Sequence, residues 1–414
     1  MRQLRLPTLQ ITSDLLCHVP MRTCLAILAA FCLSYSPLSA TANDRAMPDM
    51  AVPSAPVRIN TAEIDRRASL LMGQLEMTGM SIAIVENGEI VFAKGYGERL
   101  RDSGMTVTED TIFRWASVSK GVAAHALLSF VEDGEISLND AAEPLAPSLH
   151  LPPTETPVKL GHLLTHQVGL TRNAYDGKIE GGRSASRSRK DLGALGYICP
   201  PGTCHTYQNV AYDAMTEVIE GKAKLPYKTV VKQRIFDPLG MESASLTYEG
   251  LVGSKNWARP HSRFGDRINR IKPNYYRVPA AAGVNSSVKD LAKWMIAQMP
   301  GETIFPEARL TAIQTPKVKT LREQRFLNRR FRDLQNAHYG LGFRTYDYHG
   351  HKVVGHRGGV EGYRALMLFD PDRKAGIAMM WNSPHTRPIG LQMEFLDQLY
   401  GLPQRDWLRL NETG

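Results

Sequence analysis

The 414-residue sequence lacks several features that mark other classes of protein. It has no internal repeat of any useful period, so it is not a repeat protein. Basic residues are not interleaved with aromatic ones, and nothing therefore indicates a nucleic-acid surface. The apolar run near the N-terminus is shorter than the ~20 residues that a transmembrane helix needs. With 43% hydrophobic residues, the chain is globular and has ample material for a large core.

The first 42 residues are predicted to be an export leader. A start at Met21 gives one basic residue, an apolar run and then the small residues Ala40-Thr41-Ala42, which suit signal peptidase. Cleavage near Ala42 leaves residues 43–60, rich in Ala, Pro and Met, as a flexible lead-in. An uncleaved anchor is the alternative. The predicted location is periplasmic or secreted, with no stable membrane span after processing.

Cysteine is scarce in the predicted exported chain. Only Cys199 and Cys204 follow the leader, and they bracket a Pro-Pro-Gly turn. In an exported protein such a pair indicates a disulfide, and two reduced thiols are the alternative. The formal net charge is +9, and it falls to +7 when the leader, with three arginines and one aspartate, is removed. This charge is mildly basic and dispersed, which suits an encounter with anionic cell-envelope material.

The predicted elements follow an order that defines an α+β fold. A helix is expected over 61–75 with Thr61 as its cap, and two β-rich runs then flank Asn87-Gly88, which favours a type I′ hairpin. Strand-like runs return near the end of the chain, before a closing helix. An antiparallel sheet built from both chain ends and interrupted by a helical insertion explains this order. We expect one domain over 61–400, with an α/β part at 61–116 and 335–400, a mainly helical part at 117–334, and a tail at 401–414.

Four segments inside the domain have distinct local signals. Residues 181–190 ("GGRSASRSRK") have no core-forming side chain and are expected to form a mobile loop. Residues 319–333 are basic, and either a lid at the edge of a cleft or a solvated charged helix or loop is expected. Amphipathic spacing predicts a helix over 210–223, and Ser287 with Asp290 predicts the capped start of another.

The stretch "RWASVSKGVAAH" places Ser117 and Lys120 three residues apart at the start of a predicted helix. One helical turn brings the lysine to the serine hydroxyl, which is a poor nucleophile without a base. Burial beside other cations would lower the pKa of Lys120 and let it accept the serine proton. The alternative is a helix cap at Ser117 and a solvated lysine, and the pair alone favours that alternative.

Two further motifs follow in the chain. Tyr207 could shuttle protons beside a lysine, and Asn209 could orient a substrate amide. In "GHRGG", the glycines after His356 permit close approach of a substrate backbone to a strand. A turn packed by an aromatic ring and a glycine bulge in an edge strand are the structural alternatives. Each motif is weak by itself, whereas the three in this order are informative.

In this order the motifs resemble the serine β-lactamase and penicillin-binding-protein superfamily, in its branch of class C β-lactamases and D-alanyl-D-alanine carboxypeptidases. The segments "HLLTHQVGL", "AAGVNSSVKDLAKW" and "YGLGF" are similar to that branch as well, and the resemblance spans about residues 61–400. It implies a β-lactamase/transpeptidase-like fold, with the active site at the junction of the sheet and the inserted helical part. It implies no cofactor.

The resemblance also implies a role for each motif residue. Ser117 would be the acylated nucleophile, Lys120 its base and Tyr207 a proton shuttle. The remaining assignments are substrate binding by Asn209, His356 and Gly358, and an oxyanion hole made by the backbone N–H groups of Ser117 and Gly359.

His356 stands where many relatives have lysine. A histidine, with a reference pKa of about 6.5, does not hold a permanent charge for a substrate carboxylate. This argues against efficient β-lactamase activity and leaves peptidase, D-aminoacyl hydrolase and esterase activities open. On this reading, activity on carboxylate-bearing substrates falls as pH rises through the His356 titration.

The predicted function is an exported serine hydrolase that forms an acyl-enzyme on Ser117 with amide-type substrates. These are D-Ala-D-Ala muropeptides, D-amino-acid peptides or β-lactams. A β-lactamase-like carboxylesterase and a non-catalytic penicillin-sensing module are the alternatives. His349 and His351 could face a metal, but no third ligand is identifiable, so a surface hairpin is preferred and no metal is expected. His166 is expected to be structural.

Overall fold

A computed structural model describes residues 58–262, 267–301 and 303–410. The predicted leader and cleavage site lie outside the described residues. No helix within the described part of the chain is long and apolar enough to cross a membrane. The strands are β1 (Gly79–Glu86), β2 (Glu89–Gly97), β3 (Phe113–Arg114), β4 (Asn285–Ser286), β5 (Val318–Lys319), β6 (Leu334–Tyr339), β7 (Arg344–Tyr348), β8 (His351–Val360), β9 (Tyr363–Asp370) and β10 (Ala375–Trp381).

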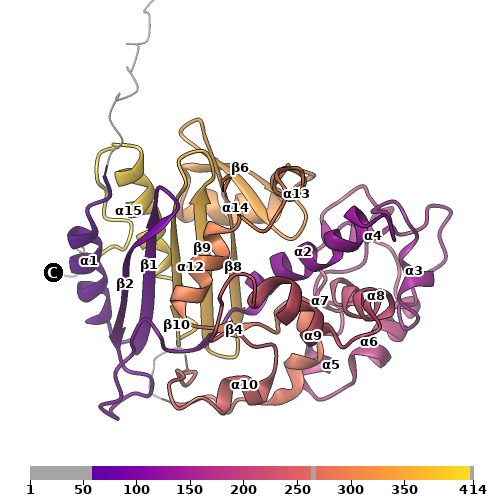
Figure 1. The fold of residues 1–414 in the computed structure, drawn as a ribbon, viewed down its shortest axis with the longest axis horizontal. Coiled ribbons are helices and arrows are strands. Elements are labelled where there is room, and N and C mark those ends of the chain that lie inside the picture. The colour runs from indigo at the N-terminus through magenta and orange to yellow at the C-terminus, as the bar shows by residue number, and fades with distance from the viewer. Residues whose placement is uncertain (1–57, 263–266, 302, 411–414) are drawn as a thin grey trace, which may run out of the picture. The chain divides into compact units, whose positions relative to one another are not determined.

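Short helices fill most of the sequence between the two groups of strands. Figure 1 shows α1 and α15 beside the sheet, and the small helices α3 to α9 gathered at the other end of the fold. The α-helices are α1 (Thr61–Met72), α2 (Ser119–Glu132), α3 (Ala142–Leu145), α4 (Leu160–Leu164), α5 (Asp176–Glu180), α6 (Ala185–Asp191), α7 (Asn209–Tyr212), α8 (Ala214–Ala223), α9 (Tyr227–Val231), α10 (Tyr248–Val252), α11 (Pro279–Ala282), α12 (Val288–Ile296), α13 (Glu307–Gln314), α14 (Leu321–Arg330) and α15 (Ile389–Leu399). Short 3₁₀ turns are η1 (Ala116–Val118), η2 (Leu192–Ala194) and η4 (Pro273–Arg277), and η3 (Lys232–Phe236) is a π-turn.

The large sheet is antiparallel and has the strand order β2-β1-β10-β9-β8-β7-β6-β5. Because β1 pairs with β10, strands from the two ends of the domain lie side by side within one sheet, next to its β2 edge. This confirms the predicted α+β architecture with a sheet built from both chain ends. The hairpin at Asn87-Gly88 is confirmed as well, since both residues adopt the positive φ angles, 54° and 80°, of a type I′ turn.

Both faces of the sheet are covered, so the strands carry apolar residues on both sides. On β1, Ile82 and Ile84 belong to the core shared with α1 and α15, whereas Ala83 belongs to the core shared with α2 and α12. Helix α12 therefore packs on the sheet, against β1 and β10, although it lies in the range expected to form the helical part. Its start is capped as predicted, because the Ser287 hydroxyl accepts from the backbone N–H of Asp290 at 3.2 Å.

Three local expectations differ from the structure. Asn60, not Thr61, caps α1, because its side chain accepts from the N–H of Glu63 at 3.1 Å. The predicted helix over 210–223 is divided at Asp213 into α7 and α8. The predicted mobile loop at 181–190 instead contains most of α6, which Ser184 caps. The difference arises because Arg189 in this segment is buried and pairs with Asp213.

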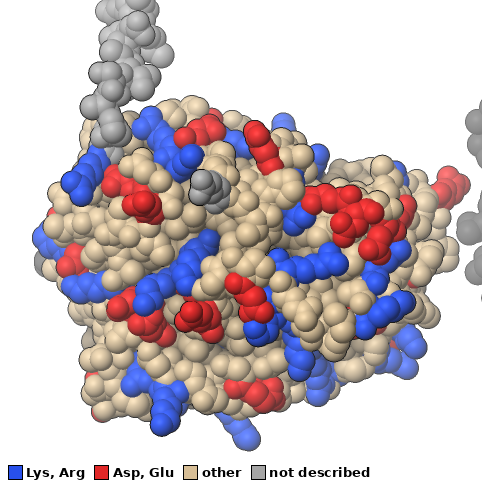
Figure 2. Space-filling model, viewed as in Figure 1, with Lys and Arg blue, Asp and Glu red and all other residues tan. Residues whose placement is uncertain are grey.

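Charged side chains are spread over the surface, as the mild net charge indicates. Figure 2 shows Lys and Arg interspersed with Asp and Glu across the face drawn. His349, at the turn before β8, lies 3.0 Å from Asp333, and His351 stacks on the ring of Tyr400 at 4.1 Å. The two histidines that were considered as metal ligands thus contact different side chains: His349 contacts Asp333, and His351 contacts Tyr400.

Candidate active site

Ser117 lies in η1, directly before α2. The preceding Ala116 has a φ of 48°, a left-handed conformation that is strained for a residue with a Cβ and that turns the chain sharply into the helix. Lys120 is in the first turn of α2, and its Nζ lies 3.3 Å from the Ser117 Oγ. Such strained turns are typical of functional sites, and this one presents the serine hydroxyl to the lysine.

Lys120 is completely buried. Its Nζ donates to the Asn209 Oδ1 at 2.7 Å and to the carbonyl oxygen of Ala281 at 2.9 Å. Burial lowers the pKa of Lys120 to about 7; the Asp176 carboxylate opposes this shift, whereas Arg344 adds to it. A substantial fraction of Lys120 is therefore an uncharged amine near neutral pH.

Tyr207 comes from the segment before α7, and its ring centre lies 4.7 Å from the Lys120 Nζ. Burial raises the pKa of its phenol to about 12, against a smaller lowering by the hydroxyl of Ser117. The Tyr207 Oη is buried and has no full hydrogen bond among the described residues. It is a protonated phenol at neutral pH, close to the nucleophile and free to donate.

Asn209 joins the lysine to an acid that was not predicted from the sequence. Its Nδ2 donates to the Asp176 Oδ2 at 2.7 Å, while its Oδ1 accepts from Lys120. Asp176 begins α5 after Tyr175, whose φ of 65° is left-handed. Burial raises the pKa of Asp176 to about 6, so it is mostly ionised at neutral pH. Asn209 is thus held between a lysine and a carboxylate, and it fixes the position of the lysine.

A second buried carboxylate, that of Asp213, lies between α7 and α8. Asp213, 1% exposed, accepts from the N–H of Ala280 at 3.1 Å and forms an ion pair with Arg189 of α6 at 2.6 Å. Arg189 also bonds Ser148 and Glu217, both at 2.7 Å. This network explains why the basic segment is a helix: one of its arginines reaches buried acids that its local sequence does not reveal.

His356 lies on β8 but is 3% exposed and points into the fold. Its Nδ1 bonds the carbonyl oxygen of Arg357 at 2.8 Å, and its Nε2 lies 2.9 Å from the Tyr339 Oη. Because a carbonyl only accepts, Nδ1 carries the proton and Nε2 accepts from the tyrosine. Burial, followed by Arg344 and Lys120, holds the pKa of His356 well below 6.5. The predicted titration near neutral pH is therefore wrong, since the imidazole is already neutral.

The two glycines after Arg357 bring β8 against the nucleophile. A Cβ on Gly358 would lie 2.1 Å from the carbonyl oxygen of Trp115 and 3.0 Å from the backbone nitrogen of Ser117, so only glycine fits. Above Gly359, the guanidinium of Arg364 occupies the place of a Cβ. The backbone of β8 thus runs directly beside that of Ser117, which is consistent with the predicted oxyanion hole at Ser117 and Gly359.

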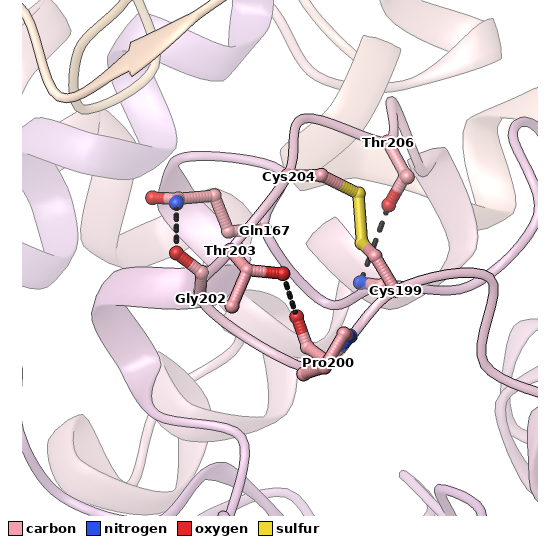
Figure 3. Close-up of a disulfide and its surroundings, with 8 residues drawn as sticks. Gln167, Cys199, Pro200, Gly202, Thr203, Cys204 and Thr206 are labelled. Atoms are coloured by element: carbon pink, nitrogen blue, oxygen red, sulfur yellow. Dashed lines mark hydrogen bonds between the residues drawn. A yellow bond between two sulfur atoms is a disulfide. The ribbon is translucent and has the colours of Figure 1, made fainter.

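Cys199 and Cys204 form a disulfide in the structure, with Cα atoms 6.4 Å apart. Figure 3 shows the loop between them tied down by the Gln167 side chain, which donates to the carbonyl of Gly202 at 2.6 Å. The chain then runs directly into Tyr207. The adjacent His166, which accepts at Nδ1 from the N–H of Gln208, lies 4.0 Å from the Tyr207 ring. The disulfide loop therefore helps to position the tyrosine.

A cavity of about 520 Å³ opens beside Tyr207, Gly358 and Gly359. We call it the arginine cleft, because five arginines line it and Glu323 of α14 is the acid among its lining residues. None of these arginines was predicted as a site residue, although Arg322 lies in the basic segment 319–333, for which a lid at the edge of a cleft was one expectation. The five are Arg172, Arg322, Arg344, Arg357 and Arg364.

Comparison with known proteins agrees with this geometry. The profile of the Beta-lactamase family matches residues 64–401, and the chain belongs to this family, whose members are serine hydrolases. It is 25% identical to the unguisins hydrolase ungD of Aspergillus violaceofuscus (strain CBS 115571) over 80% of this chain and 63% of that protein. It is also 25% identical to a D-aminopeptidase of Gluconobacter oxydans (strain 621H), over 78% of this chain and 59% of that protein. The chain thus spans about three fifths of the length of these relatives.

A solved structure shows the same fold. The octameric penicillin-binding protein homologue from Pyrococcus abyssi superimposes with a TM-score of 0.74 at 27% sequence identity. The match covers 83% of this chain and 78% of that chain. The predicted β-lactamase/transpeptidase-like fold is confirmed.

Proposed function

We propose that this chain is an exported serine hydrolase that forms an acyl-enzyme on Ser117 with amide substrates containing D-amino acids. The observation that carries the proposal is the completely buried Lys120, which has a pKa lowered to about 7 and lies 3.3 Å from the Ser117 hydroxyl. A buried, uncharged amine beside a serine is what a general base requires.

The hydrogen bonds of Lys120 orient it as that base. A neutral amine has two N–H donors and one lone pair. The two short contacts, to Asn209 at 2.7 Å and to Ala281 at 2.9 Å, take both donors. The lone pair is then left for the Ser117 hydroxyl. Lys120 therefore removes the serine proton, and Tyr207, with its pKa raised to about 12, acts as an acid.

The proposed reaction has two balanced steps. In acylation, the Ser117 Oγ bonds to the substrate carbonyl carbon while its proton passes to Lys120. The C–N bond then breaks, and the departing amine takes a proton delivered through Tyr207, which Lys120 replenishes. In deacylation, water attacks the ester carbon and gives its proton to Lys120. The ester C–O bond then breaks, the proton passes from Lys120 to the Ser117 Oγ, and the acid leaves. The backbone N–H groups of Ser117 and Gly359 would stabilise the oxyanion in both steps.

Support for D-amino-acid amides comes from the relatives, one of which is named a D-aminopeptidase. Support for export comes from the leader pattern and from the disulfide between Cys199 and Cys204, because such bonds persist in oxidising compartments. In the esterase alternative the same kind of acyl group is transferred to Ser117, but the leaving group departs through an oxygen atom instead of a nitrogen atom.

Intact-mass spectrometry after treatment with a fluorophosphonate and, separately, with a penicillin tests the proposal. We expect a single fluorophosphonate adduct that is absent from the Ser117→Ala variant, and turnover of N-acetyl-D-alanyl-D-amino acids. An adduct without any amide turnover, together with hydrolysis of simple esters, would replace the proposal with the esterase. Folded protein that forms no adduct would indicate a non-catalytic binding module.

A further inference from the structure

The charge in the arginine cleft is not balanced by the protein. Arg357 forms an ion pair with Glu323, and the Nε of Arg364 donates to the carbonyl of Pro384 at 3.2 Å. Arg344 lies 3.7 Å from the same Glu323 carboxylate, and its Nη1 is buried without a hydrogen bond among the described residues. One carboxylate thus serves two guanidinium groups, and the Arg344 Nη1, which is the atom 3.7 Å from that carboxylate, remains without a hydrogen bond. Such an arrangement is costly unless a ligand completes it.

At the mouth of the cleft the imbalance is larger. Arg172, from the loop before α5, and Arg322, at the start of α14, form no ion pair within the described residues. Burial and then the neighbouring charges of Arg322 and Arg344 lower the pKa of Arg172. Three cations from separate elements therefore converge on one space, against their mutual repulsion.

The arginine cleft adjoins the reacting centre on the side of Tyr207. The Arg344 Cζ lies 5.9 Å from the centre of the Tyr207 ring, and so does the Arg172 Cζ. In the proposed reaction, Tyr207 delivers the proton to the departing amine. The space beside it, lined by these two arginines, is therefore where the leaving half of the substrate would lie. His356, which is neutral and turned into the fold, leaves the arginines as the cations that face this space.

We propose that the arginine cleft selects a leaving group with two negative charges, namely an acidic amino acid. Its α-carboxylate binds at Arg344, and its side-chain carboxylate binds between Arg172 and Arg322. Guanidinium groups bind carboxylates with paired, charge-assisted hydrogen bonds. The inference rests on the proposed function for the reaction at Ser117, but the cleft binds the free product by itself.

Isothermal titration of the full chain with three small ligands tests the cleft without any reaction. D-glutamate carries two carboxylates, D-glutamine one and D-glutaminamide none. We expect D-glutamate to bind at least about ten-fold more tightly than D-glutamine, which in turn binds more tightly than D-glutaminamide. Raising the salt concentration weakens D-glutamate binding most. Equal affinity for D-glutamate and D-glutamine would overturn the proposal.

Variants separate the two carboxylate positions. The double variant Arg172→Gln/Arg322→Gln should remove the advantage of D-glutamate while leaving D-glutamine binding unchanged. Arg344→Gln should weaken both ligands by about ten-fold or more. Arg325→Gln is the matched control, since Arg325 is exposed on the same helix as Arg322 and does not line the cleft. If this control loses as much D-glutamate affinity as the double variant, general surface charge explains the binding and the proposal is wrong.

Turnover connects the cleft to Ser117. We expect N-acetyl-D-alanyl-D-glutamate to be cleaved with a kcat/KM at least about ten-fold above that of N-acetyl-D-alanyl-D-glutamine, and the double variant to abolish the difference. Equal kcat/KM values for the two dipeptides would contradict the proposed selection. If neither dipeptide is cleaved while the titration gives the expected order, the proposed peptidase function fails and the anionic subsite stands.

Discussion

Charged side chains lie on two sides of Ser117, and the protein compensates them differently. Behind the nucleophile, Lys120 and Asp176 are joined through Asn209, and Asp213 is neutralised by Arg189. In the arginine cleft, five guanidinium groups line one space, and its one lining acid, Glu323, pairs with only two of them, Arg344 and Arg357. In this rear network of five residues every charge has an opposite charge or a hydrogen-bond partner inside the protein, although the Asp176 Oδ1 has no full hydrogen bond among the described residues. The cleft is incomplete, and its energetics depend on what enters it.

The largest expected effect comes from breaking the rear network at its centre. Lys120→Met keeps a long side chain in the buried site but removes the base, so kcat/KM should fall by about 10²–10⁴-fold. The folded protein should persist, because an apolar group replaces a buried amine. Steady-state kinetics alongside a thermal melt give the answer. Unchanged kcat/KM in a folded variant would exclude Lys120 as the base.

The next largest expected effect is a difference in the free energy of unfolding between a variant of the rear network and a variant of the arginine cleft. Arg189→Gln leaves Asp213 buried without its counter-charge and should lower the free energy of unfolding by about 3–5 kcal/mol. Arg344→Gln removes a cation that shares Glu323 with Arg357, and it should change the free energy of unfolding by less than about 1 kcal/mol. Urea unfolding of both variants measures the contrast. Similar losses would show that the cleft arginines are structural after all.

The smallest effect is a shift of the pH profile. Activity requires neutral Lys120, so kcat/KM should rise as pH rises through about 7 and should not fall through titration of Tyr207, whose pKa is raised to about 12. The Asp176 carboxylate favours the charged lysine. Asp176→Asn therefore lowers the pKa of Lys120 and should move the acid limb of the profile to lower pH, by about one unit.

The control for this shift is Asp237→Asn, a substitution in an exposed ion pair with Lys232. It should leave the acid limb in place. If Asp176 served folding alone, Asp176→Asn would lower the maximal kcat/KM without shifting the acid limb of the pH profile. That outcome would show that Asp176 does not influence the pKa of Lys120.

The sequence revealed the parts of the site that are encoded locally. Ser117 and Lys120 are one helical turn apart, and the residues of "TYQN" are adjacent. The order of these motifs along the chain, together with the family resemblance, was therefore sufficient to single them out. Asp176 was missed because it reaches Asn209 from a separate loop, through a left-handed Tyr175 that no local pattern marks. The arginines of the cleft come from a loop, from helix α14 and from three strands of the sheet, and only the folded chain brings them together.

Two of the incorrect predictions have a common physical origin. The titration of His356 was expected from a reference pKa, but Tyr339 and the Arg357 carbonyl occupy both ring nitrogens in a buried site. The segment 181–190 was expected to be a mobile loop because it lacks apolar residues, yet the buried acids around Arg189 anchor it. In both cases a partner outside the local sequence, Tyr339 for His356 and Asp213 for Arg189, contributes to the outcome.

The close packing of Gly358 on the turn around Ser117 also constrains how this enzyme can diversify. At that point two backbones touch, and any side chain on Gly358 would strike the carbonyl of Trp115. The width of the site at the nucleophile is therefore set by main-chain atoms and is closed to substitution. Side chains define the cleft at its other end, around Arg172 and Arg322. Descendants of this sequence can acquire new substrates by exchanging residues at that end while the chemistry at Ser117 stays the same.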